Sequence, residues 1–566
     1  MLSSYTEIVL AKVLSYGAAI TAVFVVSNSV TDPVNAPKLL ILGIVGAAAF
    51  GVSLVSWARI RNFSTAITAF LVFFFLAAAL NSSVLSESPL SQNLYGVYGR
   101  NNGLITYIFL SLIFFTASLL TSNKSFESIA RGLIFAGIVN IVYCGWVIIF
   151  GDFIGWSNPY GNILGTFGNP NFIGAFLGIF LSAYVAYAIS PQRSIAWKYS
   201  LIVVVPVTLF EIIDSRAIQG RVVVAGGLAL VAFSYLRFRL NKVALGLYSF
   251  TVSAIGVFAI LGALQIGPLT QYIYKASVSL RGQYWLSGWN AGQSHPFSGV
   301  GMDALGDWYR RVRDPQALLT PGVNTVVNTA HNVFMDMFAF GGWPLFVAYI
   351  LLVAYSGNAL VRTFIRLDKF DGTFSAIAVA WIGYQVQSII SINQIGLAIW
   401  GWLLGGILIA YERSTRSQVV LGIGVETKSK GPSPINSKND DTRIIPASFI
   451  AALIGLVIAL PPFVSDTKWK SAMNAQSLQQ IEASMISSYF NPQNVNRYIQ
   501  NIQLLEESNF NDLAYKYALK AVAWNPESFD SWRFLYFVSK ATPEDRDLAL
   551  AKMKELDPLN PDVTAP

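Results

Sequence analysis

Apolar stretches long enough to cross a lipid bilayer recur along most of this chain. A helix rises about 1.5 Å per residue, so about 20 apolar residues cross a hydrocarbon core of about 30 Å. Only 12% of the 566 residues are charged, against about 25% in an ordinary soluble domain. We therefore expect an all-α, polytopic membrane protein with about 12–13 transmembrane helices. The predicted spans are 7–28, 37–56, 64–85, 103–122, 128–150, 168–190, 198–213, 219–236, 244–266, 333–356, 373–393, 396–411 and 446–465.

Lysine and arginine are unevenly divided between the two sets of alternate loops. The set that includes 412–445 carries eighteen of them, and the opposite set carries nine, five of which lie in the long loop 267–332. Basic residues accumulate in cytoplasmic loops, and long loops carry little weight in this rule. The N-terminus and 412–445 are therefore predicted to be cytoplasmic. The loops 86–102, 151–167, 213–219 and 267–332 are predicted to face outward.

Changes of composition divide the chain into four parts. Residues 1–411 form the predicted transmembrane domain, 412–445 a flexible polar linker, 446–465 the last span and 466–566 a soluble helical tail. An odd number of spans places the tail outside the cytoplasm, and one missed or false helix would reverse this. Two Asn/Asp-Pro pairs in the tail lie 32 residues apart, close to the spacing of about 34 residues in tetratricopeptide (TPR) repeats. The tail is predicted to be TPR-like.

Several function classes are disfavoured. The net charge of +8 is spread over short basic clusters between apolar stretches, which is typical of a membrane protein rather than of a nucleic-acid binder. The single cysteine, Cys144, excludes an intrachain disulfide and a cysteine metal site, and is expected to be a buried apolar residue. The outward segments contain no Asp-x-Asp, His-Glu-x-x-His or Walker A motif. We therefore expect neither a metal nor a nucleotide cofactor.

Outward polar residues beside membrane spans are candidates for function because they are costly there. Arg100 lies in LYGVYGRNNGLITY, just before a span, and is either an interfacial anchor beside tyrosines or a contact for an anion. Asn169 and Asn171 lie in GTFGNPNFIG before a long apolar helix. Either asparagine can cap that helix, and the N-terminus of a helix can also hold a phosphate. These two roles are compatible.

The hairpin DSRAIQGR places Ser215, Arg216, Gln219 and Arg221 between two apolar spans. The purely structural interpretation is a surface ion pair between Asp214 and Arg216, which would stabilise the fold by about 0–1 kcal/mol. A short hairpin on the side that is poor in positive charge has no need of two arginines, however. Because the guanidinium fork fits phosphate oxygens, we favour an anion site.

The long outward loop holds the only two histidines of the chain. His331 precedes Asn332 at the edge of the next span, whereas His295 is followed by proline and is expected to be a turn residue. Arg281 and Trp285 lie earlier in the same loop, in SLRGQYWLSGW. Histidine accepts protons near neutral pH because its unperturbed pKa is about 6.5. His331 is therefore either a structural residue or a general base.

Taken in order, four of these motifs resemble those of the O-antigen ligase and polymerase superfamily of bacterial envelope glycosyltransferases. They are GRNNGLITY, GTFGNPNFIGAF, DSRAIQGR, and a long loop with R-x-x-x-W, PFSGVGMD and AHN followed by an apolar helix containing FGG. The likeness covers roughly 90–345, and each motif alone is weak. The resemblance implies a GT-C-like membrane fold in the bacterial cytoplasmic membrane, with an extracytoplasmic active site.

The resemblance also implies a reaction in cell-envelope polysaccharide biosynthesis. A glycan would pass from an undecaprenyl pyrophosphate carrier to a glycan, lipid or protein acceptor, by inversion at the sugar and without a metal. By matching positions, Arg216 and Arg281 would be the arginines that hold the pyrophosphate, and His331 the general base. Arg221 is the alternative to Arg216 as the arginine of this hairpin that holds the pyrophosphate. The remaining substrate-binding candidates are Arg100, Asn169, Asn171, Ser215, Gln219, Trp285 and Asn332.

Two other classes of function were weighed against this one. A transporter or flippase of a lipid-linked or anionic substrate would also have many spans and buried arginines, but such proteins often contain internal repeats. The halves of this chain show no convincing repeat, and the polar candidates cluster on one side. A membrane-anchored scaffold led by the tail leaves the 267–332 loop unexplained. Protein partners bound through the tail remain an expectation.

Overall fold

The computed structural model describes residues 2–56, 63–264, 266–268, 270–273, 280–422, 437–475 and 477–564. The predicted loop residues Arg59 and Arg61 lie outside these ranges. Helices and one isolated bridge, between Ser488 and Asn491, make up the regular structure of the described residues. The helices that correspond to the predicted spans are α1 (Ser4–Val23), α2 (Asn35–Val55), α4 (Phe63–Leu85), α6 (Leu104–Ala117), α7 (Asn123–Phe150), α8 (Pro170–Ala188), α9 (Ile195–Asp214), α10 (Ile218–Leu236), α11 (Lys242–Ala263), α16 (Val333–Arg366), α17 (Gly372–Ile389), α18 (Ile395–Gly422) and α19 (Ser437–Ala475).

The prediction of a polytopic α-helical membrane protein is confirmed. Eleven of the described helices are long and apolar enough to cross a membrane, and α6 is a shorter apolar helix. Helix α18 continues to Gly422 and α19 begins at Ser437, so the two helices extend into the predicted linker 412–445 from both ends. Residues 423–436 of that linker lie outside the described ranges.

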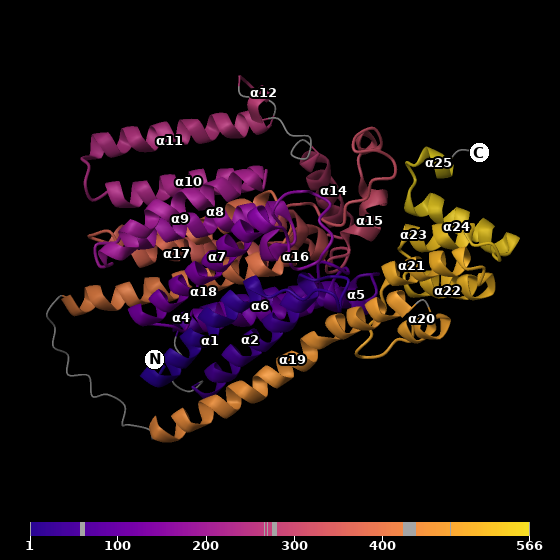
Figure 1. Ribbon diagram of the computed structural model, residues 1–566, viewed down its shortest axis with the longest axis horizontal. Helices are drawn as coiled ribbons and strands as arrows, with labels where there is room; N and C mark the ends of the chain where they lie inside the picture. The colour runs from indigo at the N-terminus through magenta and orange to yellow at the C-terminus, as the bar shows by residue number, and fades with distance from the viewer. Residues whose placement is uncertain are drawn as a thin grey trace.

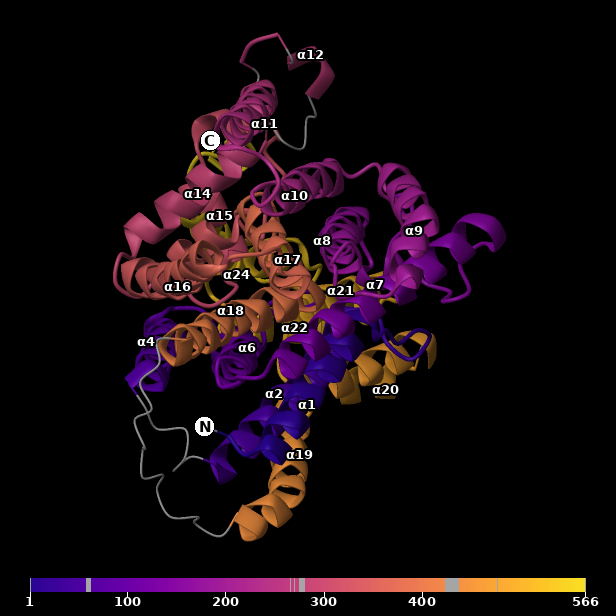
Figure 2. The same cartoon turned by 90° about the vertical axis from the view of Figure 1, so that its left-hand side faces the viewer.

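The long helices run side by side, so that the chain has two ends (Figure 1). The N-terminus lies towards one end, and α5 (Leu90–Tyr95), α14 (Arg281–Ser294), α15 (Leu305–Val312) and the C-terminal tail lie at the other. We call this second end the loop end. Helix α11 stands at the edge of the bundle (Figure 2), and none of its apolar window is buried within the protein. An apolar helix with so little of its surface covered by protein is suited to contact with lipid.

Helix α16 is kinked where the long loop crosses it. Gly341 and Gly342 have non-helical backbone angles, so the helix comprises two segments. The segment HPFSGVG packs into this kink: the N–H of Val300 donates to the Ala339 carbonyl at 2.9 Å, and the N–H of Gly301 donates to the Phe340 carbonyl at 3.1 Å. The loop therefore satisfies carbonyls that the interrupted helix leaves unpaired.

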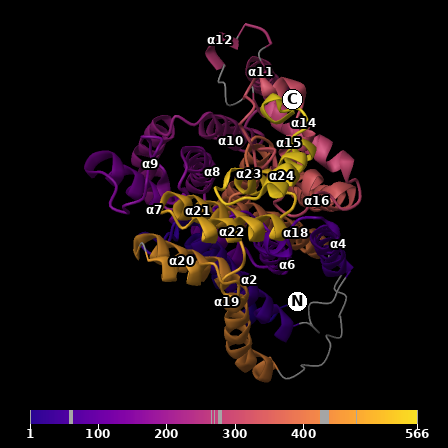
Figure 3. The ribbon, with the colours of Figure 1, turned by 90° about the vertical axis from the view of Figure 1, so that its right-hand side faces the viewer.

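The tail is a compact set of short helices with its own apolar core. Its helices lie across the loop end of the bundle (Figure 3). They are α20 (Leu478–Ser484), α21 (Val495–Glu507), α22 (Asn511–Trp524), α23 (Phe529–Phe537), α24 (Pro543–Leu556) and α25 (Pro561–Thr564). Successive helices from α21 to α24 pack against each other. This arrangement agrees with a helical module, while the TPR assignment stays a prediction.

The two Asn/Asp-Pro turns of the tail both contact the long loop. Asp557 accepts hydrogen bonds from Arg310 at 2.9 Å and Arg313 at 2.6 Å, and these three side chains are almost wholly buried. Asn525 donates to Asp307 at 3.1 Å. The recurrence that indicated a repeat in the sequence therefore also marks the two positions at which the tail docks on α15 and its C-terminal end.

A second contact joins the tail to the last span. Pro461 has no N–H, so it leaves the carbonyl of Val457 in α19 without its usual helical partner. The hydroxyl of Tyr489, in the turn after α20, donates to this carbonyl at 3.0 Å. Ile486 and Phe490 in the same turn are exposed. The tail is thus tied to a helix that is apolar enough to span a membrane.

Candidate functional site

The segments that carry the predicted site residues lie at the loop end of the bundle (Figure 1), and these residues form two groups. The first group lies on α14, on the α5–α6 segment and before α16. The second lies before α8 and at the turn between α9 and α10. Helix α14 packs against α15 and α16, whereas α10 packs against α8, α9, α11 and α17. The two groups are therefore held by different sets of helices.

His331 is the centre of the first group. Its backbone has a φ of +53°, in the left-handed region that a non-glycine residue seldom adopts. Two neighbours impose this conformation: Asn332 caps α16 by accepting from the N–H groups of Phe334 and Met335, and Asp336 accepts from the N–H of Ala330 at 2.7 Å. The turn is thus fixed on both sides of the histidine.

The environment of His331 favours the neutral imidazole. The pKa of His331 is lowered to about 4: burial is the largest cause, a hydrogen bond with the Thr329 carbonyl opposes it, and the positive charges of Arg281 and Arg100 add to the lowering. The ring nitrogen Nδ1 lies 3.3 Å from that carbonyl. If Nδ1 carries the proton, Nε2 presents its lone pair as an acceptor. The Tyr284 ring lies beside the imidazole, with 5.2 Å between the ring centroids.

Arg281 begins α14 and is half-buried. Burial lowers the pKa of Arg281, although the group stays cationic at any physiological pH. Within the described part of the chain, its guanidinium makes no ion pair and no hydrogen bond. One turn further along α14, the indole N–H of Trp285 is buried and also lacks a protein acceptor among the described residues. Two unsatisfied donors on one face of α14 suit an anionic or oxygen-rich ligand.

Arg100 has a structural partner that the sequence analysis did not assign. Its guanidinium forms an ion pair with Asp303 at 3.0 Å and donates to the Asn328 carbonyl at 3.2 Å. Asp303 is fully buried and also accepts from the N–H of Val97 at 2.8 Å. Burial raises the pKa of Asp303, and the charge of Arg100 opposes that rise. Arg100 therefore ties the α5–α6 segment to the long loop, while its charge still reaches His331.

The second group is built around α8. Ser215 lies against Gly174 of α8, where a Cβ added to the glycine would lie 2.9 Å from the Ser215 Oγ. Arg216 is exposed, with a φ of +54°, in the turn that ends α9. Gln219 donates to the Ile390 carbonyl at 3.3 Å, and Arg221 is exposed. The DSRAIQGR turn thus packs on the helix that follows GTFGNPN, which brings the second and third motifs together.

The two asparagines before α8 act at the start of this helix. The Asn169 side chain accepts from the backbone N–H of Asn171 at 2.8 Å, which makes Asn169 the N-cap. Its amide also donates to the Tyr160 hydroxyl at 3.3 Å. The capping role predicted for Asn169 is confirmed. Anion binding by Asn169 and Asn171 stays a prediction.

A polar turn between α17 and α18 bridges the two groups, and the sequence analysis missed its importance. The Ile390 carbonyl accepts from Gln219 in the second group, and the Asn393 carbonyl accepts from Asn102, next to the first group, at 2.6 Å. Gln394 donates to Asn35 at 3.2 Å. The signal in the sequence was the run SINQ between two apolar helices.

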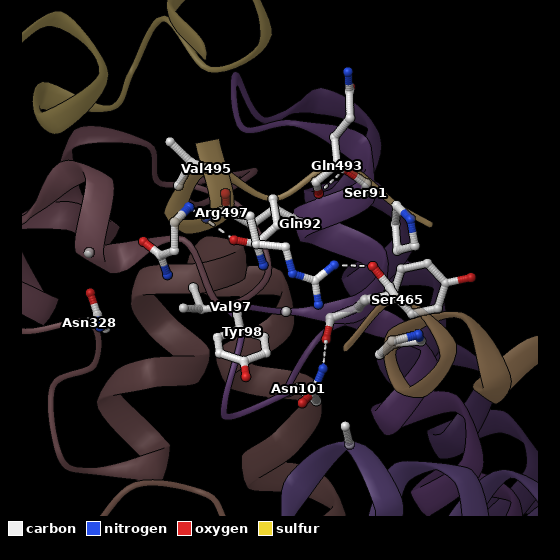
Figure 4. A pocket seen from close by; sticks show the side chains of 18 of the residues that line it. Ser91, Gln92, Val97, Tyr98, Asn101, Asn328, Ser465, Gln493, Val495 and Arg497 are labelled. Atoms are coloured by element: carbon white, nitrogen blue, oxygen red, sulfur yellow. Dashed lines mark hydrogen bonds between the residues drawn. The ribbon is translucent and has the colours of Figure 1, made fainter. Parts of the chain in front are cut away.

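A cavity of about 100 Å³ lies between the α5–α6 segment, the long loop and the tail (Figure 4). Asn101 and Asn328 are among its lining residues, so it adjoins the segment that carries Arg100. Among the described residues, including those that line this cavity, no group of three or more His, Cys, Asp or Glu side chains could hold a metal ion.

This geometry can bind a phosphorylated ligand at Arg281 and accept a proton at His331. Comparison with curated proteins finds no match for the chain. The comparison with family models finds one for a part of it, from α8 to the middle of α16, which includes Arg216, Arg281 and His331 but not Arg100. Residues 173–350 are similar to the O-antigen ligase family, Wzy_C.

Proposed function

We propose that this protein is a membrane glycosyltransferase that transfers or polymerises a glycan from a lipid pyrophosphate carrier, such as undecaprenyl pyrophosphate, onto an acceptor hydroxyl. The observation that carries the proposal is the half-buried Arg281 guanidinium. It has no protein counter-ion in the described chain, and its charge reaches a neutral His331. The similarity of 173–350 to the O-antigen ligase family supports the same reaction class.

In the proposed reaction, Arg281 binds the pyrophosphate of the donor. The acceptor oxygen attacks the anomeric carbon while the bond from that carbon to the phosphate oxygen breaks. The electron pair of that bond leaves with the pyrophosphate, and the guanidinium stabilises the charge that develops there. The acceptor proton passes to Nε2 of His331. Direct displacement inverts the anomeric centre, and the step needs neither a nucleotide nor a metal, because the pyrophosphate is already a leaving group.

Donor binding would also improve His331 as a base. A pKa of about 4 makes the imidazole a weak acceptor in the unliganded protein. Burial is the main cause, and the cationic neighbours Arg281 and Arg100 add to it. A pyrophosphate on Arg281 brings negative charge that opposes this effect and raises the pKa. The base would thus become stronger when the donor is in place.

Arg216, with Arg221 as its alternative, is the proposed second cation for the donor. It lies at the same end of the bundle as Arg281, in the turn before α10, whose Gln219 donates to the Ile390 carbonyl of the α17–α18 turn. Its position next to the N-terminal half of α8 would allow the donor to extend between the two groups. The remaining candidates in the second group would line that path.

A reconstituted transfer assay tests the proposal. The full-length protein in lipid nanodiscs is mixed with a lipid pyrophosphate-linked oligosaccharide and a glycan acceptor, and the new glycosidic bond is detected by mass spectrometry. His331→Ala and Arg281→Ala should each reduce transfer by about 10²-fold or more. The other histidine provides a matched control, because His295→Gln should retain activity, and Arg533→Ala in the tail should do the same. Full transfer by both site variants would refute the proposal, and donor movement across the bilayer without a new bond would indicate a flippase.

We further propose that the loop end faces the outside of the cytoplasmic membrane, as the distribution of basic residues indicates. The only native cysteine, Cys144, is buried, so an introduced cysteine can be labelled selectively. A Ser539→Cys variant in the tail should react with a membrane-impermeant maleimide in intact spheroplasts. Labelling only after lysis would place the tail in the cytoplasm.

A further inference from the structure

The cavity beside the Arg100 segment has a lining rich in amide side chains. Its walls come from α5 and the segment that follows it, from the long loop, and from the tail around the start of α21. Figure 4 shows several of these side chains converging on one space. Six side-chain amides line it: Gln92, Asn101, Asn328, Gln493, Asn494 and Asn496.

Some of these amides have hydrogen-bonding capacity that the protein does not use. The Asn101 side chain is buried, and its oxygen has no hydrogen-bond partner within the described chain. Asn328 and Asn496 line the cavity and are exposed, and neither side chain makes a hydrogen bond to the described residues. An amide offers both donors and acceptors, as does a sugar hydroxyl. The Asn101 oxygen is not accessible from the cavity, but a ligand with several hydroxyl groups would satisfy the exposed Asn328 and Asn496 side chains.

Three aromatic side chains complete the lining, namely Tyr95, Tyr98 and Trp524. The faces of a pyranose ring carry C–H groups that pack on aromatic rings, while the ring edge carries hydroxyl groups that reach polar side chains. An aromatic wall with a few placed polar groups is the usual make-up of a site that selects one small ligand.

The charges in the cavity disfavour an anion. Its one cation, Arg497, is already paired with Asp466 at 3.8 Å and hydrogen bonded to Ser465. Its one carboxylate, Asp307, accepts from Gln92 at 3.0 Å and from Asn525. Among the described residues, the lining thus has no unpaired positive charge for a phosphate, in contrast to Arg281. This balance favours a neutral, polyhydroxylated ligand.

We infer that this cavity is a carbohydrate subsite that binds one neutral sugar unit of the glycan being transferred or extended. The inference rests on the proposed function for the identity of that glycan. It adds that the tail takes part in substrate binding, since Gln493, Asn494, Asn496 and Trp524 come from the tail. Asn328 lies three residues before His331, and its carbonyl holds Arg100. A sugar in the cavity would therefore lie beside the reacting centre.

Saturation-transfer NMR on the full-length protein in detergent tests this subsite. The probes are methyl β-D-glucopyranoside and its 2-acetamido analogue, with inorganic pyrophosphate as competitor. At least one glycoside should receive saturation from the wild-type protein, and Asn496→Ala and Trp524→Leu should weaken its binding by about fivefold, the equivalent of about one hydrogen bond. Gln500→Ala, an exposed amide on the same helix α21 that does not line the cavity, should have no effect. Pyrophosphate should not displace the glycoside.

Three results would overturn the inference: no glycoside signal with the wild-type protein, equal binding by Asn496→Ala, or displacement of the glycoside by pyrophosphate. Asn496 is exposed and its side chain supports no described contact, so its variant remains informative even if Trp524→Leu fails to fold. In the transfer assay, the same variants should raise KM for the substrate whose sugar occupies the cavity, with kcat nearly unchanged. Whether the donor or the acceptor KM rises distinguishes the two glycans. Loss of transfer in His331→Ala with unaltered glycoside binding by Asn496→Ala would refute the subsite alone. Full transfer in both His331→Ala and Arg281→Ala, with lost binding by Asn496→Ala, would refute the proposed function alone.

Discussion

The tail should detach from the long loop when the charge of Asp557 is removed. Asp557 is the shared partner of Arg310 and Arg313, whose side chains are 5% and 0% exposed, at 2.9 and 2.6 Å. Removing one partner of a buried ion pair costs about 3–5 kcal/mol, because the remaining charge stays buried without compensation. The variant Asp557→Asn keeps the shape of the side chain. We expect it to weaken docking by at least about 3 kcal/mol, and the two pairs will not add because they share one carboxylate.

Hydrogen–deuterium exchange on the full-length protein measures this effect. A loss of about 3 kcal/mol corresponds to a decrease of about 10²-fold in protection at α15 and α25. Asp530→Asn provides the matched control, because its pair with Arg533 is 43% and 41% exposed and should contribute about 0–1 kcal/mol. The core of the transmembrane domain should keep its protection in both variants. Unaltered exchange at α15 in Asp557→Asn would refute the reasoning that buried charge pairing holds the tail in place.

The remaining predictions concern the pH dependence of transfer and two packing contacts. The pKa of His331 is lowered to about 4, so its base form is present above that pH and lost below it. A pH profile of kcat/KM should therefore fall on its acid side near pH 4. A fall near pH 6.5 would contradict the burial of the ring. Tyr489→Phe should remove the hydrogen bond to α19 and lower the protection of its turn by about 0.5–1.5 kcal/mol in hydrogen exchange, and unchanged exchange there would show that this bond contributes nothing. Gly299→Ala should lower the thermal unfolding temperature strongly, because Gly299 has a φ of +64° and the added Cβ would lie 2.1 Å from the Phe340 carbonyl oxygen. Gly226→Ala, with open space around the added Cβ, should leave that temperature unchanged. Equal unfolding temperatures of the two variants would refute the packing argument.

The spans could be predicted from the sequence because lipid imposes a simple rule on them. A membrane helix satisfies its own backbone and needs a long apolar run. Each predicted span corresponds to a helix, and eleven of these thirteen helices are long and apolar enough to cross a membrane; α6 is shorter, and α17 is not among the eleven. Only a very short loop separates the predicted spans 373–393 and 396–411, and of the two corresponding helices, α18 has the length and hydropathy of a membrane span. Asp371 caps the start of α17, and the turn before Ile395 separates α17 from α18. Helix lengths were less predictable, since α16 and α19 continue beyond the apolar run as polar helix.

The candidate site was only partly predictable, because polar partners come from distant segments. The motifs drew attention to Arg281 and His331, and the charge of Arg281 does contribute to the lowered pKa of His331. They also drew attention to Arg100, but its partner Asp303 lies about 200 residues further along the chain, and nothing in the local pattern pairs the two. The role of Asp336 could not be seen either, because it depends on a turn that only the folded chain forms.

The docking of the tail was hidden for the same reason. The sequence showed the Asn525 and Asp557 turns as a repeat, which suggested packing within the tail. In the structure both side chains point to the long loop, where they meet Asp307 and two arginines. Those arginines were counted as outward basic residues, with no sign that a carboxylate of the tail would bury them.

The most direct test of the central claim is an NMR titration of His331 in the full-length protein, with and without farnesyl pyrophosphate as a soluble analogue of the donor. The chain has two histidines, so a His295→Gln variant leaves one imidazole signal to follow. The account predicts a pKa of about 4 without the ligand and a higher pKa with it, because the pyrophosphate would neutralise Arg281. In Arg281→Gln the pKa without ligand should already be higher, and the ligand should change it little. A His331 signal that the pyrophosphate leaves unchanged in the wild-type background would contradict the claim that Arg281 binds the donor beside the catalytic base.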